Sequence, residues 1–433
     1  MSLDGRECNC PALLVTAPGS AQGKTTIAAA LARLHARAGR RVRVFKCGPD
    51  FLDPQILAVA AGSPVYNLDL WMCGESDGAE RLHRAAGEAD LILVEGVMGL
   101  HDGTPSSADL ARRFGLPLLV VIDASAMAQT FGAIVHGLTE YVPGLTCAGA
   151  LANRVESDGH AELLRQSLPA GTKWFGHVSP NAEAALPERH LGLVQASEVP
   201  DLLARLDRLA DALAATDADS LPPPVAFREE RVPAPPPLLR GKTIAVARDL
   251  AFAFTYQANL DCLEDLGARI RYFSPLVDPD IPAADAVWLP GGYPELHAAE
   301  LSANRSMLAS LRRHVGVGKP MLAECGGMML LFDRLLDATG DAHAVAGVLP
   351  GSVSMQPRLG ALGLQSVDFG NGAIRGHTFH YSRVNTPLTP LTHAERSGGG
   401  HGEAVWRLEG LTASYVHLYF PSNPVATAAL FLS

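Results

Sequence analysis

The chain lacks a surplus of positive charge. It has 35 lysine and arginine residues against 45 aspartates and glutamates, so its formal net charge is −10 at pH 7 and its isoelectric point is about 5.8. A surface that binds nucleic acid needs a basic patch. We therefore expect no nucleic-acid partner.

Apolar runs long enough to span a membrane are also scarce. The most apolar stretch, residues 116–135, carries Asp123 with proline and glycine around it, which favours a buried strand over a membrane span. The first residues have acids and cysteines where a secretory signal has a basic end followed by an apolar core. We expect a cytoplasmic protein that is neither exported nor bound to a membrane.

Cysteine is sparse, with seven in 433 residues. An odd number scattered through a long chain suits reduced thiols rather than a disulfide framework. Cys8 and Cys10 form a C-x-C, but no second pair of cysteines or histidines follows at metal-ligand spacing. We therefore expect these two residues to lie in an exposed tail.

Residues 13–26, LLVTAPGSAQGKTT, have the pattern of a phosphate-binding loop, with an apolar strand before a glycine-containing turn and an Ala- and Leu-rich helix after it. In such loops the backbone N–H groups and the helix dipole bind phosphates, the lysine reaches the terminal phosphates, and the next hydroxyl binds Mg²⁺. Pro18 stands where the usual pattern has glycine, so the loop is a variant. The candidate nucleotide-binding residues are Gly19, Ser20, Gly23, Lys24, Thr25 and Thr26.

Charged residues follow the next two strand patterns. Residues 42–54, VRVFKCGPDFLDP, carry Lys46, Asp50 and Asp53, and the very apolar run ADLILVEGVMGLHDG at 89–103 carries Glu95. Ligands of open α/β sheets bind at the carboxyl ends of parallel strands, although a solvated loop explains the first segment equally well. Lys46 is placed to neutralise charge on a transferring phosphoryl group. The candidate Mg²⁺ ligands are Thr25, Asp50 and Glu95.

Two more polar residues follow strand patterns. Asp102 lies in a glycine-flanked loop seven residues beyond Glu95, where it can contact a substrate. Asn153 ends the strand pattern at 146–154, at the sheet edge where a nucleotide base would lie. Its amide can pair with adenine, but a turn-forming asparagine is an equally simple explanation.

The order of the patterns predicts two α/β domains. Strand patterns at 116–124, 146–154 and 173–178 alternate with helix-compatible sequence, which predicts a parallel sheet covered by helices. Seven prolines in residues 221–241 predict an extended linker. We expect a nucleotide-binding domain at 1–220, the linker at 221–241 and a second domain at 242–433.

The second domain contains a candidate nucleophile. In AECGGMMLL a strand runs into a Cys-Gly-Gly turn and then a helix rich in Met and Leu, which resembles a nucleophile elbow exposing Cys325. The helix N-terminus is expected to lower the pKa of this thiol. Backbone N–H groups at Gly291 and Gly292 are candidates for an oxyanion hole. The base is expected in one of two histidine-bearing strand patterns, GHTFHYS (376–382) or ASYVHLYF (413–420).

Seven motifs occur in the order in which one family has them: KCGPDFLDP, VEGVMGLHDG, LPERHLGL (186–193), LPGGYPELHAAEL, AECGGMMLL, GHTFHYS and SYVHLYF. Together they resemble the cobyrinic or hydrogenobyrinic acid a,c-diamide synthases of cobalamin biosynthesis, over nearly the whole chain from Leu13 to about Phe420. The resemblance implies an α/β fold in two parts. These are a dethiobiotin-synthetase-like P-loop domain that acts as an ATP-dependent amide synthetase, and a flavodoxin-like class I glutamine amidotransferase domain.

The same resemblance implies a glutamine-dependent ligase. ATP with Mg²⁺ would phosphorylate the a- and c-acetate carboxylates of a corrin-ring acid, and ammonia from L-glutamine would displace the phosphate. A carboxylate is a poor electrophile until phosphate gives it a leaving group, and ammonia is scarce as a free base at neutral pH, so both kinds of site are needed. The assembly is left open, with a homodimer as the candidate.

The resemblance also implies roles for single residues. Cys325 matches the nucleophile, and we choose His417 as the base because the family's catalytic histidine lies in the last strand, with His380 as second choice. The glutamate that class I glutaminases place two residues after this histidine is absent, since Leu418 and Tyr419 follow. The ATP and metal positions match Lys24, Thr25, Lys46, Asp50 and Glu95, and the loops that meet the corrin substrate match Phe51, Leu52 and Asp102.

Two other functions stay open on the sequence. Cobyric acid synthases resemble this architecture but amidate other side chains of the ring, and the motifs KCGPDFLDP and LPERHLGL argue against them. The second is a regulatory P-loop ATPase whose degenerate glutaminase domain only binds ligands. Cys325 and His417 argue against it, because binding alone needs neither residue.

Overall fold

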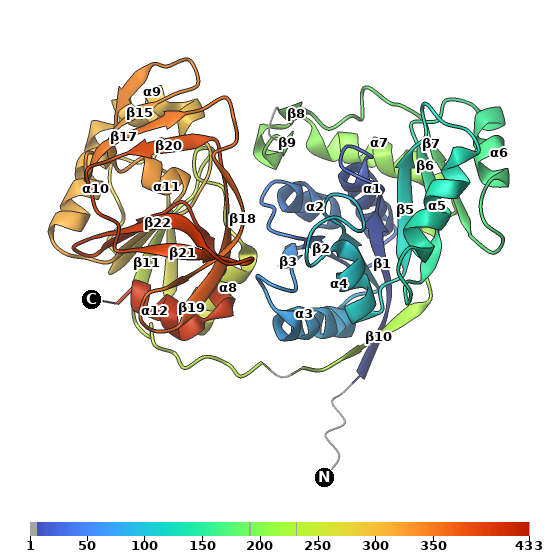
Figure 1. Ribbon diagram of the computed structural model, residues 1–433, viewed down its shortest axis with the longest axis horizontal. Coiled ribbons are helices and arrows are strands. Elements are labelled where there is room, and N and C mark those ends of the chain that lie inside the picture. The colour runs from blue at the N-terminus through green and yellow to red at the C-terminus, as the bar shows by residue number, and fades with distance from the viewer. Residues whose placement is uncertain (1–6, 190–191, 231, 433) are drawn as a thin grey trace, which may run out of the picture. The chain divides into compact units, whose positions relative to one another are not determined.

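The computed structural model describes residues 7–189, 192–230 and 232–432 (Figure 1). The chain divides into two compact units, residues 1–232 and 233–433. Residues 190 and 191 of the LPERHLGL motif lie outside the described residues. No helix that the structure describes is both long enough and apolar enough to cross a membrane.

Unit 1 is built on a parallel sheet with strand order β3-β2-β4-β1-β5-β6-β7. Helices follow most of its strands, which confirms the expected α/β fold. The strands are β1 (Glu7–Thr16), β2 (Val42–Cys47), β3 (Tyr66–Leu68), β4 (Leu91–Glu95), β5 (Leu118–Asp123), β6 (Cys147–Asn153) and β7 (Trp174–Val178). The helices are α1 (Lys24–Arg37), α2 (Asp53–Ala61), α3 (Glu75–Glu88), α4 (Ser107–Phe114), α5 (Thr130–Glu140), α6 (Asp158–Gln166) and α7 (Leu202–Ala214).

Both faces of this sheet are covered by helices. Leu13 and Val15 of β1 join the core that contains α1, α2 and α7, whereas Ala12 and Leu14 join the core that contains α3 to α6. Successive side chains of a strand point to opposite faces, so a strand covered on both faces must be apolar at every position. This explains why the strands of unit 1 read as continuous apolar runs.

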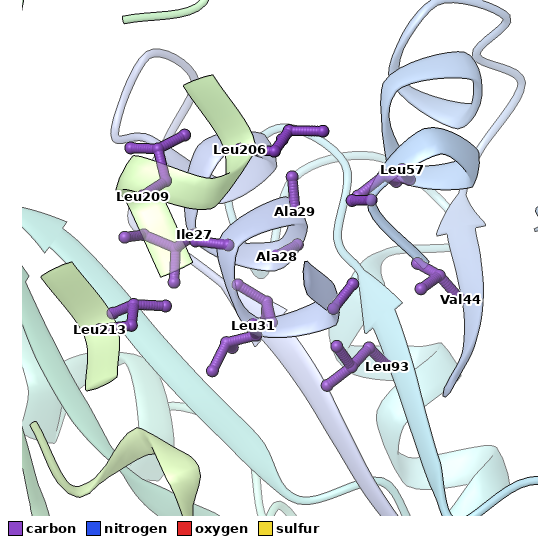
Figure 2. Close-up of a cluster of buried hydrophobic side chains, with 14 of the residues drawn as sticks. Ile27, Ala28, Ala29, Leu31, Val44, Leu57, Leu93, Leu206, Leu209 and Leu213 are labelled. Carbon is purple, nitrogen blue, oxygen red and sulfur yellow. The ribbon is translucent and has the colours of Figure 1, made fainter. Parts of the chain in front are cut away.

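Figure 2 shows how α7 covers α1. Leu206, Leu209 and Leu213 project from α7 toward Ile27 and Leu31 of α1. A spacing of three and four residues places the three leucines on one face of their helix. All five side chains are buried, and their packing holds α1 against the sheet.

Part of the expected linker is a strand. β10 (Pro224–Arg228) pairs antiparallel with the first residues of β1, from Glu7↔Arg228 to Pro11↔Pro224. The expectation of an exposed cysteine tail is wrong, because this pairing makes Cys8 and Cys10 part of β1. Cys8 is half-buried, and Cys10 is fully buried.

Unit 2 has a mixed sheet with strand order β12-β11-β13-β14-β23-β22-β21-β18-β19-β24. The first five strands are parallel and the others antiparallel. The parallel strands are β11 (Thr243–Ala247), β12 (Arg269–Phe273), β13 (Ala286–Leu289), β14 (Met321–Glu324) and β23 (Leu411–Ser414). The antiparallel ones are β18 (Ala361–Asp368), β19 (Ala373–His380), β21 (Thr392–Arg396), β22 (His401–Leu408) and β24 (His417–Leu418).

A smaller sheet and short helices complete unit 2. The sheet has the order β16-β15-β17-β20. Its strands are β15 (Phe332–Leu336), β16 (Ala342–Ala344), β17 (Leu349–Met355) and β20 (Ser382–Asn385). The helices are α8 (Gln257–Asp265), α9 (Ala298–Ala303), α10 (Arg305–Gly316), α11 (Gly326–Met329) and α12 (Pro424–Leu430).

The packing of α7 on α1 predicts a stability difference between two leucines of one helix. Leu206→Ala removes a side chain with no exposed surface and should lower the free energy of unfolding by about 2–5 kcal/mol, because a cavity remains. Leu203→Ala is the control, since Leu203 is 47% exposed and should cost less than about 1 kcal/mol. Urea unfolding of both variants measures the difference, and equal losses would contradict this packing.

Candidate functional site

The phosphate-loop candidate connects β1 to α1. Gly23 has a φ of +93°, and a Cβ at this position would lie 2.2 Å from Asn153 Nδ2. Helix α1 begins without a side-chain cap and without an acid in its first turn. Its first N–H groups therefore receive no capping side chain from the described chain, which is the arrangement in which a helix N-terminus binds an anion.

Two side chains fold onto this loop. Lys24 Nζ donates to the carbonyl of Gly19 at 2.7 Å, and Asn153 Nδ2 donates to the carbonyl of Gln22 at 3.0 Å. Burial and the neighbouring Lys46 hold the pKa of Lys24 below its ordinary value. Asn153 thus braces the loop from the end of β6, and its pairing with adenine stays a prediction.

Two strands, β2 and β4, and the first turns of α1 and α2 bring a network of charges to the foot of this loop. β2 and β4 are parallel neighbours, and their register pairs Lys46 with Glu95. Lys46 Nζ lies 2.5 Å from Asp53 Oδ2 and 3.1 Å from Glu95 Oε1. Thr25 Oγ1, at the start of α1, donates to Glu95 Oε1 at 2.6 Å and lies 3.3 Å from Asp53 Oδ2. Thr25, Lys46 and Glu95, all chosen from sequence, therefore do meet.

Burial sets the protonation of this network. Glu95 has no exposed surface, and its burial raises its pKa to about 7 although Lys46 opposes the shift. Burial alone would lower the pKa of Lys46, but Asp53 and Glu95 outweigh it and hold that pKa above its ordinary value. The lysine therefore stays charged, while the glutamate is poised to lose or gain a proton near neutrality.

Sequence reasoning placed both Asp50 and Asp53 in this loop but chose Asp50, and not Asp53, as the candidate metal ligand. Asp50 Oδ1 accepts from the backbone N–H groups of Leu52 at 2.8 Å and Asp53 at 3.1 Å, so it fixes the turn that leads into α2. None of the described hydrogen bonds joins Asp50 to Thr25 or Glu95. An Asp two or three residues before a helix start often binds backbone N–H groups of its own turn, and this tendency could have directed attention to the second acid of DFLDP.

The network suits a divalent cation that prefers oxygen. Glu95 Oε2 is buried without a hydrogen-bond partner in the structure, while Glu95 Oε1 and Asp53 Oδ2 share the Thr25 hydroxyl. Among the described residues, no group of three His, Cys, Asp or Glu side chains is arranged as a complete metal site. Two carboxylates and a hydroxyl nevertheless match Mg²⁺, which is bound by few protein oxygens and keeps several waters.

The expected substrate loops follow β2 and β4, the strands that carry Lys46 and Glu95. Leu52 is 8% exposed, and Phe51 beside it is half-buried. Asp102 is exposed, and its Oδ2 accepts from Gly99 N at 2.8 Å, closing a tight loop. Leu100 N donates to Ala17 O at 2.9 Å, which ties this loop to the phosphate loop. Contact of Phe51, Leu52 and Asp102 with a substrate stays a prediction.

Unit 2 holds the second group of candidates, beginning with Cys325 between β14 and α11. Its backbone has φ +46° and ψ −110°, a strained conformation for a residue with a side chain. A Cβ on Gly326 would lie 2.8 Å from Pro294 Cδ, and one on Gly327 would lie 2.2 Å from Leu289 O. The two glycines therefore permit a sharp strand-to-helix turn, as in a nucleophile elbow.

The expectation that a helix lowers the pKa of Cys325 is wrong. Burial, followed by the charge of Glu295, raises this pKa above its ordinary value, and the thiol is 5% exposed. α11 is only four residues long, so its dipole is too short to offset the loss of hydration. Cys325 is therefore a neutral thiol in this structure and needs a base.

His417 and the Gly291-Gly292 turn lie close to the elbow. A Cβ on Gly291 would lie 2.2 Å from His417 Cε1, and one on Gly326 would lie 3.0 Å from Gly292 N. The turn therefore contacts both the imidazole and the residue that follows the cysteine. His417 stacks on His377 with ring centroids 5.0 Å apart, and burial lowers its pKa, which keeps the ring neutral and able to accept a proton.

His380, the alternative base, is engaged elsewhere. Its Nε2 lies 3.1 Å from Glu403 Oε1 and its Nδ1 lies 2.9 Å from the carbonyl of Ser382. The ring also stacks on Tyr415, with centroids 3.6 Å apart. Both ring nitrogens face protein oxygens and are engaged with them. This geometry favours His417.

Comparison with known families finds matches in both units. Residues 13–194 match the family described as the CobQ/CobB/MinD/ParA nucleotide binding domain. Residues 243–425 match the family described as the CobB/CobQ-like glutamine amidotransferase domain. A solved structure of a glutamine amidotransferase, covering 43% of this chain and 96% of its own, aligns with 16% identity and a TM-score of 0.33, too low to support an argument.

Curated relatives match over almost the whole chain. The hydrogenobyrinate a,c-diamide synthases of Pseudomonas aeruginosa and Stutzerimonas stutzeri are each 58% identical to it, with 98% of both chains covered. The cobyrinate a,c-diamide synthase of Herminiimonas arsenicoxydans is 50% identical, with 97% of this chain and 96% of the relative covered. The chain therefore belongs to the cobyrinate and hydrogenobyrinate a,c-diamide synthase family.

Proposed function

We propose that this protein converts the a- and c-acetate carboxylates of hydrogenobyrinic or cobyrinic acid into amides, with L-glutamine as nitrogen donor and MgATP as activator. The observation that carries the proposal is that one chain holds two different reactive groups. A charged network lies beside a phosphate loop in unit 1, and in unit 2 the Gly291-Gly292 turn contacts both the ring of His417 and the residue that follows Cys325. We assign the synthetase to residues 1–220 and the amidotransferase to residues 242–433, in a cytoplasmic enzyme.

The residues of unit 1 suit phosphoryl transfer from ATP to a carboxylate. The phosphate loop and Lys24 bind the phosphates, and Lys46 offsets negative charge on the group in transfer. Thr25, Asp53 and Glu95 would hold Mg²⁺, which when bound neutralises charge on the phosphate oxygens. The acyl phosphate formed in this way has the leaving group that a free carboxylate lacks.

The residues of unit 2 suit hydrolysis of glutamine. His417 takes the proton from Cys325 Sγ, and the thiolate attacks the carboxamide carbon of glutamine. Backbone N–H groups of the Gly291-Gly292 turn stabilise the oxyanion. The protonated His417 gives its proton to the departing ammonia, and water then releases glutamate from the thioester. The ammonia displaces phosphate from the acyl phosphate.

Replacement of the thiol should separate the two half-reactions. Cys325→Ala should lose glutamine-supported amidation by about a thousandfold or more while amidation with added ammonium salt continues, because only nitrogen release needs the thiol. Cys262→Ala, a second buried cysteine of unit 2, is the matched control and should keep both activities. Products of both ring acids, with and without cobalt, are measured by mass spectrometry. Loss of the ammonia reaction as well would make Cys325 structural.

Glu95 should make Mg²⁺ binding depend on pH. Because burial raises its pKa to about 7, the carboxyl holds its proton at about pH 6 and is ionised at about pH 8. The rise in Tm that MgATP gives over ATP with a chelator should therefore be larger at the higher pH. Glu95→Gln should lose most of this rise, and amidation should fail with either nitrogen donor. The same pH dependence in wild type and variant would remove Glu95 from the metal site.

A further inference from the structure

Glu324 is a buried carboxyl that the steps above do not use. It is the last residue of β14, directly before Cys325, and it is 2% exposed. Burying a carboxyl is unfavourable, and here it raises the pKa of Glu324 to about 8. A buried carboxyl needs hydrogen bonds that compensate for its lost hydration. The hydrogen-bond partners of Glu324 show which segments of the chain it links.

Each carboxyl oxygen accepts from a different strand. Oε1 accepts from the backbone N–H of Leu418, and Oε2 accepts from the indole N–H of Trp288, both at 2.9 Å. Leu418 directly follows His417 in the two-residue strand β24. Trp288 belongs to β13, and Gly291 comes three residues after Trp288 in the chain. One side chain therefore links the segments that carry the nucleophile, the base and the oxyanion turn.

The strand that carries His417 is only two residues long. β24 pairs with β19 over two residues, Leu418↔Gly376 and His417↔His377. The carbonyl of Leu418 accepts from Asn259 Nδ2 at 2.8 Å, so side chains bind both the N–H and the C=O of this residue. The backbone beside the imidazole is thus fixed from one side by Glu324 and from the other by Asn259.

We infer that Glu324 is a positioning residue, which holds the His417 segment and the Gly291-Gly292 turn at fixed places relative to Cys325. Class I glutaminases have a glutamate two residues after the histidine, and this chain lacks it. Glu324 replaces its positioning role, but it binds the backbone of Leu418 and not the imidazole ring of His417. The Leu418 N–H and the Trp288 N–H can only donate hydrogen bonds, so the side chain between them must offer two acceptor oxygens. Among side chains of this size only a carboxyl has two. The inference rests on the proposed glutaminase reaction.

Glu324→Gln tests the inference with almost no change in volume. An amide has one acceptor oxygen, so its NH₂ group must face either the Leu418 N–H or the Trp288 N–H, and one link opens. The kcat for glutamine hydrolysis should fall by about a hundredfold, since displacement of a catalytic group by about 1 Å has an effect of this order. The KM for glutamine should change little, and amidation with ammonium salt should keep its rate.

Two variants separate positioning from a general loss of stability. Ser310→Ala removes another buried acceptor of unit 2, the hydroxyl on α10 that accepts from Ile281 N at 3.1 Å. This variant should leave kcat unchanged even if its Tm falls as far as that of Glu324→Gln. Trp288→Phe opens only the indole link and should lower kcat by less than Glu324→Gln does. If Glu324→Gln does not fold, a lowered kcat with unchanged KM in Trp288→Phe still supports the inference, and an unchanged kcat overturns it.

The outcome for Glu324 is distinct from the outcome for the proposed function. Wild-type kcat in folded Glu324→Gln, or an equal loss of kcat in Ser310→Ala, overturns the positioning role while an inactive Cys325→Ala leaves the glutaminase reaction standing. If Cys325→Ala still uses glutamine, the proposed function fails instead.

Discussion

The chemistry proposed for unit 1 depends on one ammonium group that lies between two carboxylates, one of them fully buried. Lys46 is 3% exposed and contacts Asp53 and Glu95, and Glu95 has no exposed surface. Two carboxylates could not share this site without a cation, because burial and mutual repulsion both favour protonation. The parallel register that sets Lys46 beside Glu95 is therefore an electrostatic condition for the site as well as a feature of the sheet.

The candidate reactive groups of unit 2 are neutral, whereas those of unit 1 are charged. Cys325 and His417 are both buried, and burial favours the neutral form of each, so the thiol and the imidazole are stored without charge. In the proposed reaction charge appears only when the proton moves, and the Gly291-Gly292 turn is the group proposed to stabilise it. Rigid support matters more in such a site than a lowered thiol pKa, since a neutral pair reacts only when its geometry is right.

The sequence predicts most of the fold where a local pattern determines it. The strands of unit 1 are covered on both faces and read as apolar runs, so residues at their carboxyl ends, such as Lys46 and Glu95, could be assigned to one edge. Pairing between distant segments leaves no local signal. Strand β10 and the burial of Cys10 were missed for this reason, because most of the sequence of unit 1 lies between β1 and β10.

For the candidate sites too, local motifs could be predicted from the sequence, whereas contacts between distant segments could not. Cys325 and the glycines after it form a recognisable motif, but the pKa of the thiol depends on burial and on Glu295, which comes from another segment. Asp50 and Asp53 lie three residues apart, and only the folded loop shows that Asp50 binds the backbone of the turn before α2 while Asp53 meets Thr25. Glu324 is plain in the sequence, whereas its two N–H donors come from remote strands.

The division of work between the two units is tested most directly by following one oxygen atom. The ring acid is labelled with ¹⁸O in its carboxylates and incubated with the protein, MgATP and a nitrogen donor. If unit 1 forms an acyl phosphate, one labelled oxygen should pass to inorganic phosphate for every amide formed, with glutamine in wild type and with ammonium salt in Cys325→Ala. Amide formation with unlabelled phosphate would contradict this division.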